Sequence, residues 1–359
     1  MKLLIYAING RGLGHLNRSL VIAGGLRAFA RKNKKPLEIR FLCESPAFKL
    51  VEHAGFKANK LPDRHAVDGF KLGAPVNDRI VAQAFDVWLR QWRPDMVLID
   101  FSMNERLFRT VRAHGVKAGI IARELRPSTV QQAKKKTLAP LLNLVLIPHR
   151  AEDVPFSAYP SAWRPIARHL GHVAKTLDPS LVTGVRARYC SPSEKLVVVT
   201  IGGGGFEESY ATLHAAQAAA QETDANLRWL LVYGPYYNRP LPADNGSVLH
   251  RKYEANLPEL FAAADAVVCN AGYNTIQEVR KSGAPAIVIP LKQTGGDDQE
   301  ARARAFAAEK RALIAGPTAD EVLSCVKQIV YEQRVVKDAP ETEEGPEQLG
   351  ERVWAALHH

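Results

Sequence analysis

Short apolar runs alternate with longer amphipathic segments along the whole chain. In the first half, the apolar runs have the length of buried strands and fall at residues 2–8, 37–43, 57–61, 96–100, 118–122 and 144–148. The segments between them have helical periodicity, at residues 16–30, 46–54, 78–91 and 104–113. Residues 62–76 have no clear periodicity and are predicted to form a loop. Because strands and helices alternate, the pattern predicts a parallel sheet with helices on both faces.

A second series of the same kind follows. Its predicted strands are residues 195–201, 228–233, 247–250, 266–269 and 286–290, and its predicted helices are residues 207–221, 257–264 and 275–282. Residues 152–192, between the two series, are rich in proline and lack periodicity, so we expect the domain boundary there. The pattern predicts an α/β protein with two doubly wound domains, at residues 1–165 and 166–335. Residues 336–359 form a tail that ends in an amphipathic helix at 348–357.

The composition is that of a globular protein with a basic excess. The formal net charge is +11, from 48 Lys and Arg against 37 Asp and Glu. This charge attracts anionic lipid or nucleotide-linked substrates, and the sequence has no nucleic-acid-binding motif. No apolar run approaches the roughly 18 residues of a spanning helix, and no signal peptide precedes the first strand. The widely spaced cysteines favour reduced thiols in the cytoplasm (Cys43, Cys190, Cys269 and Cys325).

A glycine-rich loop joins the first predicted strand to the first predicted helix. Gly10, Gly12 and Gly14 lie where a dinucleotide-binding domain has its phosphate loop. The spacing departs from that fingerprint, and no acidic residue closes the second strand in the usual way, although Glu44 comes near the place. The dinucleotide interpretation is therefore weak.

The residue after this loop suggests a different interpretation. His15 would project into a cleft at the mouth of the loop, where it could act as a general base. It could equally cap the helix. Arg18 follows three residues later and could contact a phosphate or lie exposed.

The second half contains a candidate anion pocket between the strand at 266–269 and the next helix. Gly272 would free the turn to adopt a positive φ, and Asn274 or Thr275 is expected to cap the helix. Backbone N–H groups and the positive helix end would then converge on a phosphate or diphosphate. Glu278, one turn further on, could accept hydrogen bonds from the hydroxyl groups of a ribose. Each feature alone is common in α/β proteins.

Two more loops are expected at the same edge of the second sheet, where ligands bind in such folds. Four glycines follow the strand at 195–201. The backbone groups of Gly203, Gly204 and Gly205 are expected to be accessible next to the proposed pocket, because glycine has no side chain. The loop after 286–290 ends in Asp298 and Gln299, polar groups able to hold the hydroxyl groups of a sugar.

The combination of these residues resembles the donor-binding region of the GT-B glycosyltransferases of the MurG type, family 28. The matching positions are Gly272, Thr275, Glu278, Gly283, Pro285, Pro290, Asp298 and Gln299. The resemblance implies two Rossmann-like domains that face each other across a cleft, with the last helix returned to the first domain. The first loop has fewer contiguous glycines than MurG-like proteins usually carry. This departure bears on the inference about the acceptor more than on the inference about the fold.

For function, the resemblance implies transfer of a sugar from a nucleotide-diphosphate donor, expected to be UDP-linked, to an acceptor hydroxyl. His15 would deprotonate the acceptor, Glu278 would hold the ribose, and Asp298 with Gln299 would hold the sugar. The leaving diphosphate would be stabilised at the helix N-terminus and at the glycines, so no metal and no cofactor are expected. Tyr253 lies in the segment where GT-B enzymes hold the nucleotide base through backbone groups.

Three alternatives stay open. Residues 12–18 also resemble the nucleotide-sugar hydrolase PseG, in which water is the acceptor. A dinucleotide-dependent oxidoreductase would explain the first loop but not the second pocket. A non-catalytic sugar-nucleotide-binding or membrane-surface protein would keep the donor pocket.

A membrane contact rests on one stretch of the sequence. The basic residues Lys134, Lys135 and Lys136 precede the apolar residues 138–142, a combination that suits the inner face of a membrane and a lipid-linked acceptor. The acceptor itself is not identified by the sequence.

Overall fold

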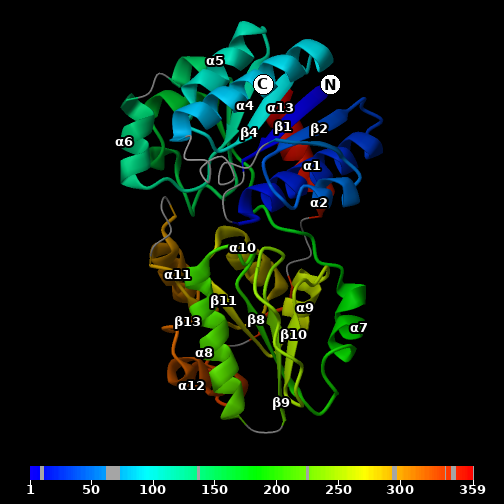
Figure 1. The fold of residues 1–359 in the computed structure, drawn as a ribbon, viewed down its shortest axis with the longest axis vertical. Coiled ribbons are helices and arrows are strands. Elements are labelled where there is room, and N and C mark those ends of the chain that lie inside the picture. The colour runs from blue at the N-terminus through cyan, green and yellow to red at the C-terminus, as the bar shows by residue number, and fades with distance from the viewer. Residues whose placement is uncertain are drawn as a thin grey trace. The chain divides into compact units, whose positions relative to one another are not determined.

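The computed structural model describes residues 1–8, 12–61, 73–135, 138–223, 226–292, 297–335, 337–340 and 345–358. Two compact units make up the chain (Figure 1). Unit 1 contains residues 1–173 and 344–359, and unit 2 contains residues 174–343. The division falls between Val173 and Ala174 instead of between residues 165 and 166, and the last segment begins at residue 344 instead of 336.

Unit 1 has a seven-stranded parallel sheet with the order β3-β2-β1-β4-β5-β6-β7. Its strands are β1 (Lys2–Ala7), β2 (Glu38–Cys43), β3 (Lys57–Lys60), β4 (Met96–Asp100), β5 (Lys117–Ile121), β6 (Leu144–Ile147) and β7 (Ala167–His169). Its helices are α1 (Gly14–Lys32), α2 (Lys49–His53), α4 (Gly73–Trp92), α5 (Glu105–Ala113), α6 (Pro127–Lys135) and α13 (Pro346–His358).

Unit 2 has a six-stranded parallel sheet with the order β10-β9-β8-β11-β12-β13. Its strands are β8 (Lys195–Thr200), β9 (Leu227–Val232), β10 (Val248–Arg251), β11 (Ala266–Asn270), β12 (Ala286–Ile289) and β13 (Ala312–Ile314). Its helices are α7 (Val182–Ala187), α8 (Tyr210–Gln221), α9 (Leu257–Ala263), α10 (Tyr273–Ser282), α11 (Gln299–Ala308) and α12 (Ala319–Val330). The predicted α/β class with two parallel sheets is confirmed.

The burial of the central strands explains why they could be predicted from the sequence. Every residue of β4 and β11 is buried, as expected for strands covered by helices on both faces. Burial of each large aliphatic side chain stabilises the fold by about 1.5–3 kcal/mol. The four cysteines are free thiols, as predicted, and burial raises the pKa of Cys43 to about 11 and that of Cys269 to about 12.

Three local predictions are corrected. The proline-rich segment 152–192 is not only a linker, because it contains β7, which pairs in parallel with β6. Residues 73–76, predicted as loop, begin α4, and residues 62–72 lie outside the described residues. Lys337 and Asp338, assigned to the tail, belong to unit 2: the Lys337 Nζ atom donates to the Ala264 carbonyl at 2.9 Å, and the Asp338 N–H donates to Gly283 at 2.9 Å.

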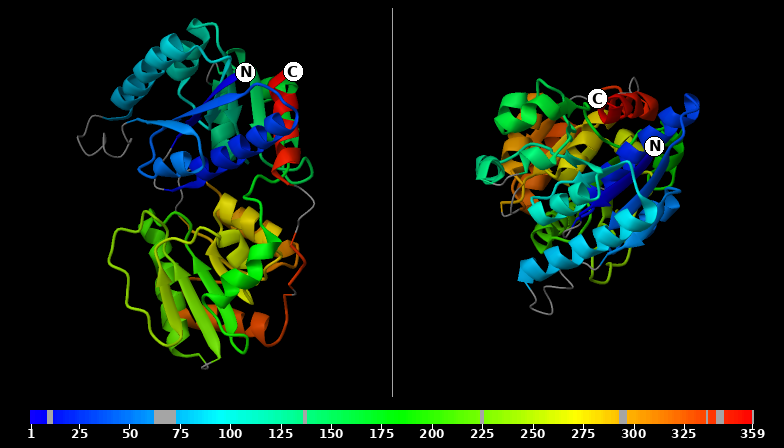
Figure 2. Two further views of the ribbon diagram at one scale, coloured as in Figure 1. Left: turned by 90° about the vertical axis from the view of Figure 1, so that its right-hand side faces the viewer. Right: turned by 90° about the horizontal axis from the view of Figure 1, so that it is seen from above.

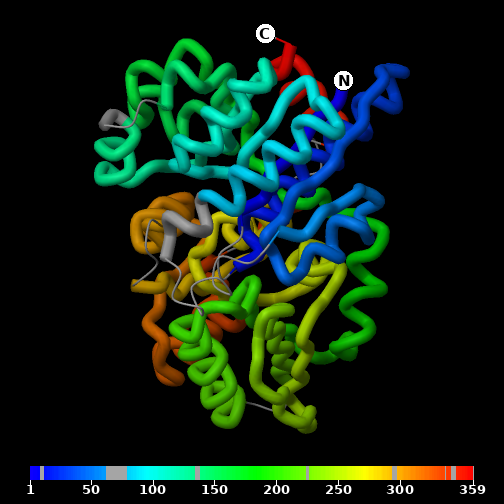
Figure 3. The backbone as a smooth tube through the Cα atoms, turned by 45° about the horizontal axis from the view of Figure 1, so that its top comes forward, coloured from blue at the N-terminus to red at the C-terminus, as the bar shows by residue number. Residues whose placement is uncertain are grey.

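The C-terminal helix α13 completes unit 1 by packing against α1 (Figures 2 and 3). The two helices meet at two glycines: a Cβ atom on Gly350 would lie 2.0 Å from the Gly25 carbonyl oxygen, and one on Gly25 would lie 2.8 Å from the Pro346 carbonyl oxygen. The backbones therefore touch at this crossing, which only glycine allows.

Candidate active site

In unit 1, the carboxyl end of β4 and the first turn of α1 form a histidine–carboxylate pair. The Nδ1 atom of His15 lies 2.9 Å from Oδ1 of Asp100. Asp100 is the last residue of β4 and is fully buried, whereas the His15 side chain is 31% exposed. The pair leaves Nε2 as the ring nitrogen that does not face the carboxylate.

Two other residues of α1 hold the Asp100 carboxylate in place. The Arg18 guanidinium donates two hydrogen bonds to Asp100, one of them from Nε to Oδ2 at 3.0 Å, and Ser19 donates to Oδ2 at 3.2 Å. Burial alone would raise the pKa of Asp100. The charges and hydrogen bonds of Arg18 and His15 outweigh burial and hold that pKa below its usual value. Asp100 is therefore a carboxylate at neutral pH.

This arrangement changes the interpretation of Arg18. The sequence left open a phosphate contact or an exposed position, but the side chain is only 2% exposed and lies against Asp100, with Nη2 also 3.2 Å from the His15 ring. Arg18 thus positions the pair. Helix α1 begins with Leu13 as its N-cap, which makes no side-chain capping bond, so His15 is not the cap.

The loop before α1 is described from Gly12 onward, and Gly10 lies outside the described residues. Gly14 opens α1, and a Cβ atom there would meet no atom within 4 Å. Packing within the described chain therefore does not require glycine at this position. Glu44, which comes near the place of the acidic residue in a dinucleotide-binding domain, is buried and accepts a hydrogen bond from the Tyr6 hydroxyl.

In unit 2, the glycines after β8 form a tight loop against the end of β9. Gly202 and Gly204 have positive φ angles of 69° and 74°, and a Cβ atom on Gly204 would lie 2.2 Å from the Tyr233 carbonyl oxygen. The Gly203 carbonyl accepts from the Tyr236 N–H at 2.9 Å, and the Gly204 carbonyl accepts from the Tyr210 hydroxyl at 3.1 Å. Within the described chain, the N–H groups of Gly203, Gly204 and Gly205 donate to no acceptor.

The N-terminus of α10 lies beside this loop. A Cβ atom on Gly202 would be 3.7 Å from Thr275 Oγ1, and one on Gly272 would be 3.8 Å from the same atom. Gly272 is the N-cap, with φ −65° instead of the expected positive value, and it provides no side-chain cap. The prediction that Asn274 or Thr275 caps the helix is wrong, because both residues lie in its first turn. A helix N-terminus whose N-cap supplies no side chain, beside glycine N–H groups without an acceptor in the described chain, is suited to bind an anion.

Glu278 lies in the second turn of α10 and is 7% exposed. Its carboxylate makes no hydrogen bond or ion pair with the described residues. Burial raises the pKa of Glu278, the charge of Lys175 opposes this effect, and the charge of Glu259 adds to it. A buried carboxylate without a partner is costly, so its acceptor capacity is available to a ligand.

At the end of the loop after β12, the side chains of Asp298 and Gln299 each accept a hydrogen bond from a backbone N–H group. Asp298 is exposed and is the N-cap of α11, where its Oδ1 accepts from the Ala301 N–H at 3.0 Å. Gln299 is 7% exposed and its Oε1 accepts from the Leu291 N–H at 3.2 Å, so its amide NH₂ group is the part left for other partners. One oxygen of each residue is therefore used by the fold itself.

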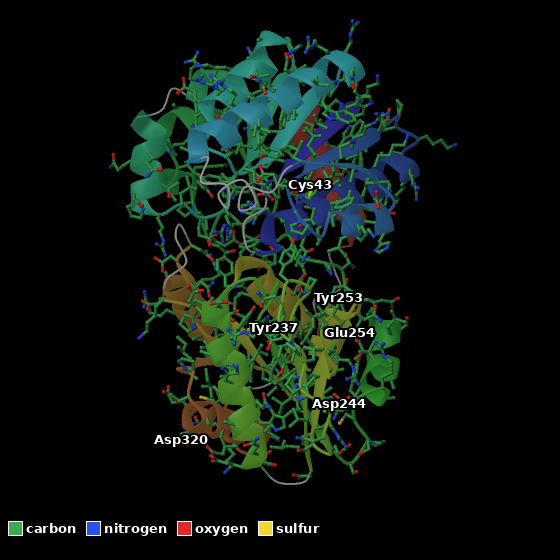
Figure 4. The ribbon with its side chains drawn as sticks, in the orientation of Figure 1. Cys43, Tyr237, Asp244, Tyr253, Glu254 and Asp320 are labelled. Atoms are coloured by element: carbon green, nitrogen blue, oxygen red, sulfur yellow. The ribbon has the colours of Figure 1, made fainter. Side chains whose placement is uncertain are left out.

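Tyr253 follows β10 and lies next to Glu254 (Figure 4). Its side chain is 46% exposed. Glu254 is buried, and it accepts hydrogen bonds from the Tyr189 hydroxyl and from the Asn256 N–H. The backbone at Tyr253 is therefore anchored by its neighbour, whereas its ring is free to contact a ligand.

Two residues of the site were not singled out from the sequence. Asp100 was read only as the end of a strand, yet an acidic residue that closes the fully apolar run Met-Val-Leu-Ile is a signal for a site at the carboxyl edge of a parallel sheet. Lys175 lies in the segment between the two sheets, which has no periodicity, and nothing in the sequence connects it to Glu278.

The described residues contain no group of three or more His, Cys, Asp or Glu side chains that could hold a metal ion. None of the helices in the described ranges combines the length and apolar character needed to cross a bilayer.

Known proteins resemble this chain in both sequence and fold. Residues 196–330 match the family model of the glycosyltransferase family 28 C-terminal domain. The UDP-N-acetylglucosamine--N-acetylmuramyl-(pentapeptide) pyrophosphoryl-undecaprenol N-acetylglucosamine transferase of Alkaliphilus metalliredigens is 32% identical over 143 residues, which are 35% of this chain and 36% of that protein. An uncharacterized glycosyltransferase of Methanosarcina acetivorans is 22% identical over 364 residues, 93% of this chain and 91% of that protein.

Among solved structures, the spinosyn forosaminyltransferase SpnP matches all of this chain and all of its own with a TM-score of 0.70 at 17% identity. The two parallel sheets and this match define a protein with the GT-B fold. The match to the glycosyltransferase family 28 C-terminal domain falls within its second unit, and the chain is similar in sequence to MurG-type transferases. The chain spans about a third of the length of the curated MurG-type transferase that it matches at 32% identity.

Proposed function

We propose that the chain is a glycosyltransferase that moves a sugar from a nucleotide-diphosphate donor, a UDP-sugar, to an acceptor hydroxyl without a metal ion. The observation that carries the proposal is Glu278. It is a buried carboxylate with no partner among the described residues, one turn inside a helix whose N-cap Gly272 makes no side-chain capping bond. The glycine N–H groups beside that N-cap donate to no acceptor in the described chain. A nucleoside diphosphate supplies what this pocket lacks: hydroxyl donors for the carboxylate and an anion for the helix end.

The strand order of the second sheet suggests how the donor lies along the carboxyl ends of its strands. Tyr253 follows β10, the glycine loop follows β8, the α10 N-terminus follows β11, and Gln299 follows β12. In this proposal the base lies near Tyr253 and the diphosphate between the glycine loop and α10. The sugar then lies near Asp298 and the Gln299 amide.

The proposed chemistry uses residues of both described sites. The acceptor oxygen attacks the anomeric carbon of the donor sugar, the bond from that carbon to the diphosphate oxygen breaks, and His15 takes the acceptor proton at Nε2. Asp100 fixes the ring through Nδ1 and stabilises the imidazolium that forms. The N–H groups at Gly203 to Gly205 and at α10 stabilise the charge on the leaving diphosphate. Lys175, a half-buried cation without an ion pair among the described residues, adds positive charge near Glu278.

The charge distribution favours an anionic environment for the acceptor. Unit 1 contains 30 Lys and Arg against 16 Asp and Glu, a net charge of +14, whereas unit 2 contains 18 against 21, a net charge of −3. The name of the Alkaliphilus protein includes a pyrophosphoryl-undecaprenol group, a diphosphate attached to lipid. We propose that unit 1 likewise receives an acceptor attached to lipid, at an anionic membrane surface, where the positive charge of unit 1 is attracted.

The first experiment is thermal stabilisation of the purified protein by UDP, GDP, dTDP, CDP, ADP and NAD, for the wild type and for Glu278→Ala. A ligand at about 100 times its Kd adds about 2.7 kcal/mol of stability. The proposal expects stabilisation by one nucleoside diphosphate and its loss in Glu278→Ala. Stabilisation by NAD alone would favour an oxidoreductase and reject the proposal.

Turnover then separates transfer from hydrolysis. The sugar form of the stabilising nucleotide is incubated with the protein in the absence of any acceptor. Rapid release of free sugar under these conditions favours the hydrolase alternative. Release of the nucleoside diphosphate that rises on addition of an extract of membrane lipids, without a matching rise in free sugar, supports transfer. A donor that binds without ever being consumed supports a non-catalytic binding protein.

A further inference from the structure

A cavity of about 820 Å³ lies at the amino ends of the strands of the first sheet. The His15–Asp100 pair lies at the opposite, carboxyl end of these strands. The cavity is open to solvent and is lined by the end of α4, the start of β4, the turn between α5 and β5, and the end of α13. Figures 1 and 2 show both ends of the chain at the amino ends of these strands. The volume falls within the range of small-molecule sites, about 300–1,000 Å³, and no step of the proposed transfer uses it.

The floor of the cavity is apolar. Leu89, Met96, Val116 and Leu357 contribute to its lining, and each is at most 7% exposed. These four side chains come from α4, β4, the α5–β5 turn and α13, so the floor is held by the packing of unit 1. An apolar floor gains free energy when a ligand covers it, about 25 cal/mol per Å².

The rim of the same cavity is basic. Arg93 and Lys117 are exposed, and neither side chain makes an ion pair or a hydrogen bond with the described residues. Arg90, also at the rim, is paired with Asp86 at 2.6 Å. The acidic residue of the lining, Asp95, accepts a hydrogen bond from the Lys2 N–H at 2.7 Å and is thereby occupied by the fold.

From this geometry we propose that the cavity is a second ligand site, separate from the transfer site, for a small amphipathic anion. The apolar body of the ligand covers the floor, and its single carboxylate, sulfonate or phosphate head lies between Arg93 and Lys117. Phosphate alone lacks the apolar contact, and a neutral or cationic amphiphile lacks the ionic one.

The test compares ligands that share one tail. Decanoate, decanol and decyltrimethylammonium are titrated below their aggregation concentrations by isothermal calorimetry, with inorganic phosphate as the head alone. We expect saturable binding of one decanoate per chain, at least about tenfold tighter than decanol, which corresponds to one lost charged contact. The ammonium amphiphile and phosphate should bind more weakly still.

Variants assign the binding to this cavity. Arg93→Glu with Lys117→Glu should weaken decanoate at least about tenfold, whereas Lys310→Glu, a surface reversal in unit 2, should leave it unchanged. Both changed rim side chains are exposed, and a melting curve checks that the fold is kept. Equal affinity for all three amphiphiles, equal binding by phosphate, no binding of decanoate, or an unchanged affinity in the rim variant each overturns the proposal.

Discussion

The Nδ1 atom of His15 is 2.9 Å from Oδ1 of Asp100, although the two residues are 85 positions apart in the chain. The contact fixes which ring nitrogen faces a substrate. We predict that His15→Ala lowers kcat by about 100- to 10,000-fold, the usual range for a general base, with little change in the donor KM. Steady-state rates against donor concentration test this, and a loss below about threefold would exclude His15 as the base.

Asp100→Asn should reduce the rate through the orientation of His15, because an amide NH₂ can donate to Nδ1 where the carboxylate accepts. It also removes the carboxylate charge that the buried Arg18 guanidinium contacts, and breaking a buried ion pair costs about 3–5 kcal/mol. We therefore expect both a slower reaction and a lower Tm. Ser19→Ala removes one hydrogen bond from the same carboxylate without changing its charge and is the matched control, with a loss of about 1 kcal/mol.

The pH dependence of stability should have two components of opposite sign. The folded-state pKa of Asp100 is lowered from 3.8, so its contribution to stability is complete above pH 3.8 and is lost as the pH falls toward the folded value. The folded-state pKa of Glu278 is raised from 4.5, so the ionised side chain destabilises the fold as the pH rises above 4.5.

Glu278→Gln should therefore stabilise the protein at neutral pH, by about 1 kcal/mol or 2–4 °C in Tm, and should also lose the stabilisation by nucleotide. The gain in Tm should shrink as the pH approaches 4.5. Melting curves at neutral and acid pH, with and without the nucleotide, measure both effects. A lower Tm at neutral pH would show that the carboxylate has a partner in the free protein.

Substitution of two glycines of unit 2 should change different properties: the stability of the fold at Gly204 and nucleotide binding at Gly272. Gly204→Ala places a Cβ atom 2.2 Å from the Tyr233 carbonyl oxygen at a positive φ, so we expect a loss of about 2–4 kcal/mol in stability. Gly272→Ala meets only Thr275 Oγ1 at 3.8 Å and has an ordinary φ of −65°. Gly272→Ala should leave the Tm unchanged and weaken nucleotide binding, because the added methyl group lies at the N-terminus of α10. Equal effects of the two substitutions on binding and on Tm would contradict this division.

The crossing of α1 and α13 allows a similar comparison. Gly350→Ala directs a Cβ atom at the Gly25 carbonyl oxygen and should destabilise unit 1 by about 2–4 kcal/mol. Gly24→Ala, one residue from the contact, meets no atom within 4 Å and should stabilise α1 by about 0.5–1 kcal/mol. Denaturant titration of the two variants measures the difference, and equal midpoints would mean that the helices do not touch as described.

Much of this fold could be predicted from the sequence, because strands buried on both faces are continuous apolar runs. The strands β1, β4, β8 and β11 were predicted on this basis. Short edge elements were missed: β7 has three residues and lies in a proline-rich segment without periodicity. The start of α10 was misplaced because Asn274 and Thr275 are good capping residues, and tertiary structure placed Gly272 at the cap instead.

The candidate site was predictable where its residues are close in sequence. Gly272 and Glu278 share one helix and its cap, so their proximity could be predicted from their spacing, whereas the donor pocket was inferred from the combined resemblance to MurG-type proteins. The partners of His15 and Glu278 could not be predicted, since Asp100 and Lys175 come from distant segments that only the folded chain brings near. Arg18 was misjudged for the same reason: an arginine three residues past a helix start looks exposed until the strand it faces is known.

Unit 1 is built from the two ends of the chain, and unit 2 is inserted between them. During synthesis on the ribosome, the first sheet therefore emerges long before α13, which contacts α1 through Leu349, Gly350 and Trp354. The whole of unit 2 can fold while the apolar face of α1 is still uncovered and open to association with other chains. The helix that carries His15 thus acquires the support of α13 only after the whole of unit 2 has been made.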